Sequence, residues 1–228
     1  VSSMRSLMYE DREVKTRHLV EVAHGVLAQF QAREKEPGAS REELQKQALA
    51  VIKAMRYDEK EYFWINDLGK PVPKMVMHPT VPALDGKTLD EARFNKATSK
   101  RLGASGEPLS LDRQNLFVAF NETVEAAGHG FVTYLWPKPK PGGGVTEELY
   151  TKLSYVKKFE PWGWVVGSGI YVDDVDALFY RHAKEQLALA ILAGLALLAV
   201  NWAVRRSIFN EFGGEPRFAM KLADRIAK

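Results

Sequence analysis

Cysteine is absent from all 228 residues of the chain, and its absence removes several classes of chemistry. Without thiols the chain has no disulfide, no thiolate nucleophile and no cysteine-based zinc site. A surplus of charge is lacking too, since 32 Lys and Arg stand against 29 Asp and Glu, for a net charge of +3. Because the sequence also has no dense basic stripe with interleaved aromatic residues, we expect no nucleic-acid partner.

Patterns typical of catalysis or metal binding are equally scarce. The acidic group Asp173, Asp174 and Asp176 lacks the glycine and the distal glutamate of a calcium loop, and it suits the start of a helix. The "KPGGG" segment has no lysine–threonine continuation, so it is interpreted as a linker and not as a phosphate loop. No set of nucleophile, base and orienting group stands out. We therefore predict no enzyme, no metal and no cofactor.

One long apolar run is present at 187–204, "LALAILAGLALLAVNWAV", with Asn201 as its single polar residue. As a helix it would span roughly 27 Å, close to the thickness of a bilayer core. Arg205 and Arg206 follow at once, which places the C-terminal side in the cytoplasm and residues 1 to about 185 outside. A buried core helix is the alternative, but the rest of the chain is too polar to surround it. We predict a transmembrane helix over 185–206.

The start of the chain bears on this topology. It reads "VSSMRSLMYEDREVKTRH", with no initiator methionine and no apolar leader. A domain outside the membrane must have been carried across it. We therefore expect a first membrane segment upstream of Val1, which would make the chain a fragment.

Helical patterns dominate the first quarter of the sequence. Residues 1–35 contain no proline and place apolar residues at helical spacing, which predicts one long amphipathic helix. The segment "EPGAS" ends it. Ser40 then opens a second helix, with Glu43 three residues later as in a capping box.

From Glu61 the pattern changes to strands. "EYFWIND" and "PKMVMHP" are strand-like, 79–108 is mostly loop, and a further helix is predicted at about 110–127. Three more strands follow at "GFVTYLWPKP", 149–159 and 162–172, before the helix that enters the apolar run. Short connectors between neighbouring strands favour an antiparallel sheet with the long helix on one face. The fold class is α+β.

Three stretches carry a resemblance to a known family. "YFWIND…MVMHP…LDGK", "GFVTYLWPKP" and "KLSYVKKFEPWGWVVGSGIYVDD" resemble, in this order, the single Cache sensor domain of bacterial chemoreceptors and related sensor kinases, over residues 5–180. The tail "FGGEPRFAMKLADRIAK" resembles the start of a HAMP linker.

The resemblance implies a domain outside the cytoplasm in which a long N-terminal helix packs on a PAS-like antiparallel sheet of about five strands. Such domains bind small molecules, often short carboxylic acids. By this analogy residues 1–184 are the sensor, 185–206 cross the inner membrane and 207–228 begin the HAMP-like linker. The receptor is then a homodimer, with the 1–35 helix at the interface and the sensor periplasmic or extracellular.

A buried carboxylate requires charge-assisted donors, and a short aliphatic tail favours aromatic walls. Residues of these kinds on or beside the predicted strands are Arg56, Trp64, His78, Tyr134, Trp136, Lys152 and Tyr155. Each has a structural alternative: core packing for the aromatic residues, a structural hydrogen bond for His78, exposure to solvent for Lys152 and the helix dipole for Arg56. Lys152 and Tyr155 have opposite parity, so one regular strand cannot direct both into one pocket.

Four functions remain open from the sequence. The leading one is the ligand-binding sensor of a chemoreceptor. The others are the input domain of a histidine kinase, a ligand-free structural dimerisation module and a membrane-anchored enzyme.

Overall fold

The computed structural model describes residues 2–58, 61–211 and 216–226. It divides into two compact units, Val1–Ala177 and Leu178–Lys228. The first unit contains the sheet and the site, and the second unit is helical.

The first unit opens with two helices, as the sequence predicts. Helix α1 (Ser2–Ala32) continues into a short 3₁₀ turn, and α2 (Arg41–Ala54) follows it. The predicted cap at Ser40 is confirmed, because the Ser40 hydroxyl accepts a hydrogen bond from the backbone N–H of Glu43 at 3.4 Å. Both helices bury one apolar stripe, which includes Val20, Ala23 and Leu27 of α1 and Leu44, Ala48 and Ile52 of α2.

A seven-stranded antiparallel sheet forms the centre of this unit, in the order β2-β1-β7-β6-β5-β3-β4. Its strands are β1 (Trp64–Asp67), β2 (Met75–Met77), β3 (Asn95–Leu102), β4 (Pro108–Asn115), β5 (His129–Pro139), β6 (Val145–Phe159) and β7 (Trp164–Tyr171). Short 3₁₀ turns lie at Arg33–Lys35, Pro82–Leu84, Ala92–Phe94 and Glu160–Trp162. The longest strands, β5 and β6, form a hairpin through the "KPGGG" turn.

The α+β class and the antiparallel sheet are confirmed, but the sheet has seven strands and not about five. The additional strands, β3 and β4, lie where the pattern predicted mostly loop and the first residues of a helix. Both are polar, β3 mostly half-buried and β4 largely exposed, so neither carries an apolar alternation. The helix α3 (Leu116–Ala127) begins at its cap, since the Asn115 side chain accepts hydrogen bonds from two backbone N–H groups of the first turn.

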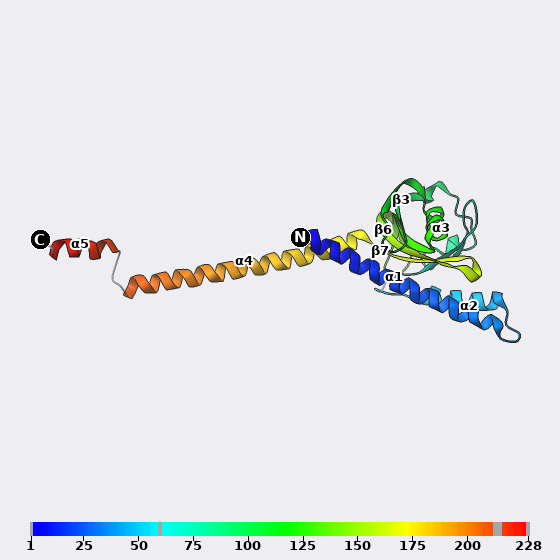
Figure 1. Ribbon diagram of the computed structural model, residues 1–228, viewed down its shortest axis with the longest axis horizontal. Helices are drawn as coiled ribbons and strands as arrows, with labels where there is room; N and C mark the ends of the chain where they lie inside the picture. The colour runs from blue at the N-terminus through cyan, green and yellow to red at the C-terminus, as the bar shows by residue number, and fades with distance from the viewer. Residues whose placement is uncertain (1, 59–60, 212–215, 227–228) are drawn as a thin grey trace. The chain divides into compact units, whose positions relative to one another are not determined.

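The sheet is covered on both faces. Helix α1 packs along one face with α2 beside it, and α3 packs against the other face, inside the curve of the sheet (Figure 1). Strand β7 is buried at every residue, because it lies between β1 and β6 and is covered on both sides. Its two faces therefore belong to two separate hydrophobic clusters, one on the α3 side and one on the α1 side.

Helix α4 (Val172–Glu211) begins directly after β7 and continues into the second unit, where α5 (Pro216–Ile226) follows. Among the described residues, Val172–Asn210 is a helix long and apolar enough to cross a membrane, by length and composition. The predicted span 185–206 lies within it and stays a prediction. The predicted HAMP-like linker falls partly outside the described residues.

Candidate functional site

A fully buried lysine lies on the α3 side of the sheet. Lys152 is in the middle of β6, and its side chain is 0% exposed. Within the described part of the chain its Nζ makes no hydrogen bond. The nearest countercharge is Glu61, whose Oε2 lies 3.8 Å from Nζ. The ring centroids of Tyr62 and Tyr171 lie 4.2 and 4.6 Å from the same atom, so the ammonium is held by cation–π contacts and a long ion pair.

The strand register produces this arrangement. Lys152 is the partner of Tyr134 on β5 and of Tyr171 on β7, so a tyrosine flanks it on each side of the same sheet face. The Tyr134 hydroxyl shares a hydrogen bond of 2.9 Å with Ser154, and the Tyr171 hydroxyl donates to the carbonyl of Pro137 at 2.7 Å. Burial raises the pKa of both phenols, so they stay neutral.

A buried histidine lies on the same side. The ring of His78 lies between Tyr62, at 5.1 Å between centroids, and Trp136, at 5.7 Å. The backbone N–H of Val81 donates to His78 Nδ1 at 3.2 Å, which leaves the proton of the neutral ring on Nε2. Burial, together with the positive charge of Lys152, lowers the pKa of His78 to about 3. The histidine is therefore a neutral donor at physiological pH.

This low pKa predicts a loss of stability in acid. The unfolded histidine takes up a proton below about pH 6.5, whereas the folded one resists it until about pH 3. Its contribution to stability is thus complete above pH 6.5 and is lost as the pH falls towards 3, by up to about 1 kcal/mol per pH unit. We expect the melting temperature to fall between pH 7 and pH 4, followed by circular dichroism, and to fall less steeply in His78→Gln. Parallel curves for the two proteins would contradict the buried neutral histidine.

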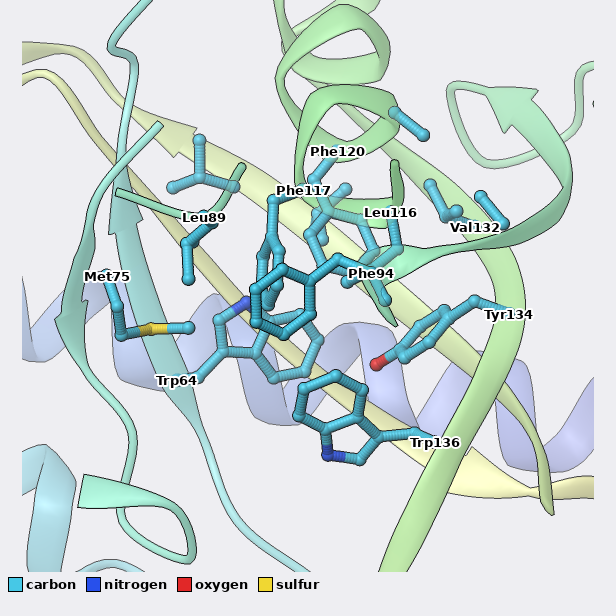
Figure 2. Packing of buried hydrophobic residues seen from close by; sticks show 14 of the residues in the cluster. Trp64, Met75, Leu89, Phe94, Leu116, Phe117, Phe120, Val132, Tyr134 and Trp136 are labelled. Carbon is cyan, nitrogen blue, oxygen red and sulfur yellow. The ribbon is translucent and has the colours of Figure 1, made fainter. Parts of the chain in front are cut away.

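Aromatic side chains complete an enclosure around Lys152 and His78 on the α3 side of the sheet. Trp64, Tyr134 and Trp136 gather beneath α3, and the Tyr134 side chain points towards the two tryptophans (Figure 2). Tyr134 and Trp136 are 6.3 Å apart between ring centroids, and Trp64 packs on Phe120 at 5.2 Å. The indole Nε1 of Trp64 is buried and has no hydrogen-bond partner among the residues that the structure describes.

Five of the seven residues proposed from the sequence thus lie in one connected cluster on the α3 side: Trp64, His78, Tyr134, Trp136 and Lys152. The other two lie elsewhere. Tyr155 faces α1, where it packs on Phe131 at 5.0 Å, because alternate residues of β6 point to opposite faces. Arg56 is exposed, and its Nη1 donates to the carbonyls of Lys53 and Met55 at 2.7 Å, at the C-terminal end of α2.

Sequence reasoning missed three residues that contact Lys152: Glu61, Tyr62 and Tyr171. The sequence contained a weak signal for Glu61, because this acidic residue opens the apolar run "EYFWIND". In the structure Glu61 is only 4% exposed. A buried acid of this kind requires a countercharge.

Comparisons with known sequences find relatives of this chain. A family model described as a Cache domain matches residues 2–192. The methyl-accepting chemotaxis protein McpP of Pseudomonas putida is 41% identical over 204 residues, which cover 88% of this chain and 32% of that protein. The sensor histidine kinase MctS of Rhizobium johnstonii is 26% identical over 171 residues, 74% of this chain and 32% of the kinase. The chain thus spans about a third of the length of these relatives.

Solved structures show the same fold. A periplasmic sensor domain of a chemotaxis protein is 44% identical with a TM-score of 0.54, covering 71% of this chain and 96% of that one. A Cache chemosensory domain, described for its recognition of carboxylic acids, is 38% identical with a TM-score of 0.55, covering 73% and 97%. A methyl-accepting chemotaxis protein from Vibrio parahaemolyticus, 19% identical with a TM-score of 0.54 over 76% and 97%, supports the fold alone.

Proposed function

The chain belongs to the Cache domain family, and from that membership we propose that it is the extracytoplasmic sensor of a transmembrane chemoreceptor that binds a short-chain carboxylate. The observation that carries this proposal is the buried Lys152 ammonium, whose Nζ makes no hydrogen bond within the described residues. An ammonium in this state is costly, and a carboxylate that accepts charge-assisted hydrogen bonds from it removes the cost.

Each neighbouring side chain has a role in this proposal. Lys152 binds the carboxylate, and the His78 Nε2–H donates a second hydrogen bond to it. Trp64, Tyr134 and Trp136 contact the aliphatic part of the ligand and limit its size. The solved relative described for carboxylic acid recognition supports the ligand class. The site binds its ligand without a cofactor, and we expect no turnover.

Signalling would begin at the last strand. Tyr171 contacts the Lys152 ammonium, and the next residue, Val172, begins α4. A ligand that binds two arrangements of this junction with different affinity shifts the equilibrium between them. We further propose that residues 1–184 are periplasmic or extracellular, that 185–206 span the inner membrane, and that 207–228 begin a HAMP-like linker. The receptor would be a homodimer.

The second candidate function is the input domain of a histidine kinase, and similarity to a sensor histidine kinase supports it. The same sensor would then control phosphorylation instead of chemotaxis. In the intact protein, the sequence that follows the HAMP-like segment discriminates the two. A chemoreceptor continues as a long heptad-patterned helical hairpin, and a kinase continues with a phospho-acceptor histidine and an ATP-binding domain.

The decisive test of the ligand class compares acids with uncharged molecules of the same shape. The chain, held in lipid nanodiscs, is titrated calorimetrically with acetate, propionate, lactate and pyruvate, and with acetamide and propionamide. We expect at least one acid to bind and its amide to bind about a hundredfold more weakly, because only the acid offers Lys152 an anionic oxygen for a charge-assisted hydrogen bond. Equal binding of acid and amide would rule out an anion site. No binding by any compound would favour the ligand-free structural module.

A further inference from the structure

We propose that Glu61 is an internal competitor for the ligand, so that its carboxylate is the anion which a bound carboxylate replaces beside Lys152. This inference rests on the proposed carboxylate-binding function. It adds a residue that sets the affinity of the site and that has to change partner when the ligand binds.

The backbone fixes Glu61 beside the lysine. The N–H of Tyr57 donates to the carbonyl of Glu61 at 3.2 Å, and the N–H of Glu61 donates to the carbonyl of Tyr57 at 2.9 Å. This bridge holds the backbone of Glu61 in place just before β1. The Glu61 side chain is 5% exposed, so its carboxylate lies inside the enclosure and not in bulk solvent.

The ion pair is long. At 3.8 Å, Oε2 of Glu61 lies within ion-pair distance of Lys152 Nζ but beyond hydrogen-bond distance. Glu61 therefore balances the charge of Lys152 without accepting a hydrogen bond from it through that oxygen. A ligand carboxylate at the usual charge-assisted distance of about 2.8 Å gains more from the same ammonium. At Lys152 the exchange of one carboxylate for the other is thus favourable, because a charge-assisted hydrogen bond replaces a long ion pair.

One ammonium cannot hold both anions. Two carboxylates beside a single cation in a medium of low dielectric repel each other strongly. The other basic group described at the site, His78, is neutral and adds no positive charge. Arrival of the ligand therefore displaces the Glu61 carboxylate.

The structure has a place for the displaced side chain. A cavity of about 200 Å³ adjoins Glu61 and is lined by Arg12 of α1, by Asp58, by Tyr171 and by Asp174 in the first turn of α4. Arg12 is partly exposed, and its Nη1 binds Asp58 at 3.0 Å. A Glu61 carboxylate in this cavity reaches solvent and competes with Asp58 for the guanidinium. Ligand binding would thereby change the surroundings of residues in both α1 and α4.

The test is the affinity of Glu61→Gln, which keeps the shape of the side chain and removes its charge. We expect this variant, in nanodiscs, to bind acetate and propionate at least about tenfold more tightly than the wild type, because the internal competitor is gone. Glu42→Gln is the matched control. It makes the same change at an exposed residue in the first turn of α2 that does not line the cavity, and it should leave affinity within about twofold.

Each other outcome decides against the proposal. Unchanged or weaker binding of acetate by Glu61→Gln, with normal binding by the wild type, would overturn the competitor role and leave the carboxylate sensor intact. Loss of lactate binding alone would show that Glu61 accepts the hydroxyl group of a ligand instead. A wild type that binds no acid would overturn both proposals. If Glu61→Gln does not fold, Glu61→Asp replaces it, since a shorter acid lies farther from Nζ and should tighten binding in the same direction.

Discussion

Replacing Lys152 with methionine is expected to weaken carboxylate binding by at least about a hundredfold, the loss typical when one partner of a buried charge pair is removed. Methionine fills the same elongated space between Tyr62 and Tyr171 but offers no charge and no donor. The His78 Nε2–H would remain, yet one neutral donor does not compensate a buried carboxylate. Calorimetric titration with the acid that the wild type binds best measures the loss.

Two further variants make this result interpretable. Lys152→Met alone buries the Glu61 carboxylate with its countercharge removed, which costs stability. The double variant Lys152→Met, Glu61→Gln removes both charges, so it should fold at least as well as the single variant and still not bind. Lys157→Met is the control, because Lys157 is on the same strand with the opposite parity. Binding by the double variant within tenfold of Glu61→Gln alone would exclude Lys152 as the anion site.

The local parts of the fold could be predicted from the sequence. The 1–35 helix and the cap at Ser40 depend on spacing and on residues three apart, which a linear pattern contains. The same holds for the hairpin of β5 and β6, whose apolar residues end at a turn rich in proline and glycine. Strands β3 and β4 could not be found in this way. They are held by the pairing of β4 with β3 and of β3 with β5, and their polar side chains leave no apolar pattern.

In the candidate site, too, the local features could be predicted from the sequence and the long-range contacts could not. Strand parity, which is local, separated Lys152 from Tyr155, and the structure places them on opposite faces. Whether Lys152 is buried could not be decided, because the answer depends on β6 lying between β5 and β7 with α3 above. The contact with Glu61 was equally inaccessible. It joins β6 to a residue before β1 that is far away in the sequence, and only the completed sheet brings the two together.

Replacing Gly167 with alanine is expected to destabilise the sensor unit by about 3 kcal/mol or more, the upper end for overpacking a core. Gly167 on β7 is the partner of Trp64 on β1, and a Cβ added there would lie 2.3 Å from the nearest ring carbon of that tryptophan. The indole is 2% exposed, so it has no free space to move into. Thermal unfolding followed by circular dichroism measures the cost. Carboxylate binding should weaken as well, since Trp64 is a wall of the proposed site.

The clash with Trp64 can be isolated from other effects of the substitution. Trp64→Leu removes the ring atoms that the new Cβ would meet, so the double variant should lose clearly less stability than the sum of the two single variants. Gly25→Ala is the opposite control: it lies in the interior of α1 with nothing near its Cβ position, and there the same change should stabilise by about 1 kcal/mol. Strict additivity of the two single variants would place the cost in the strand backbone and not against the indole.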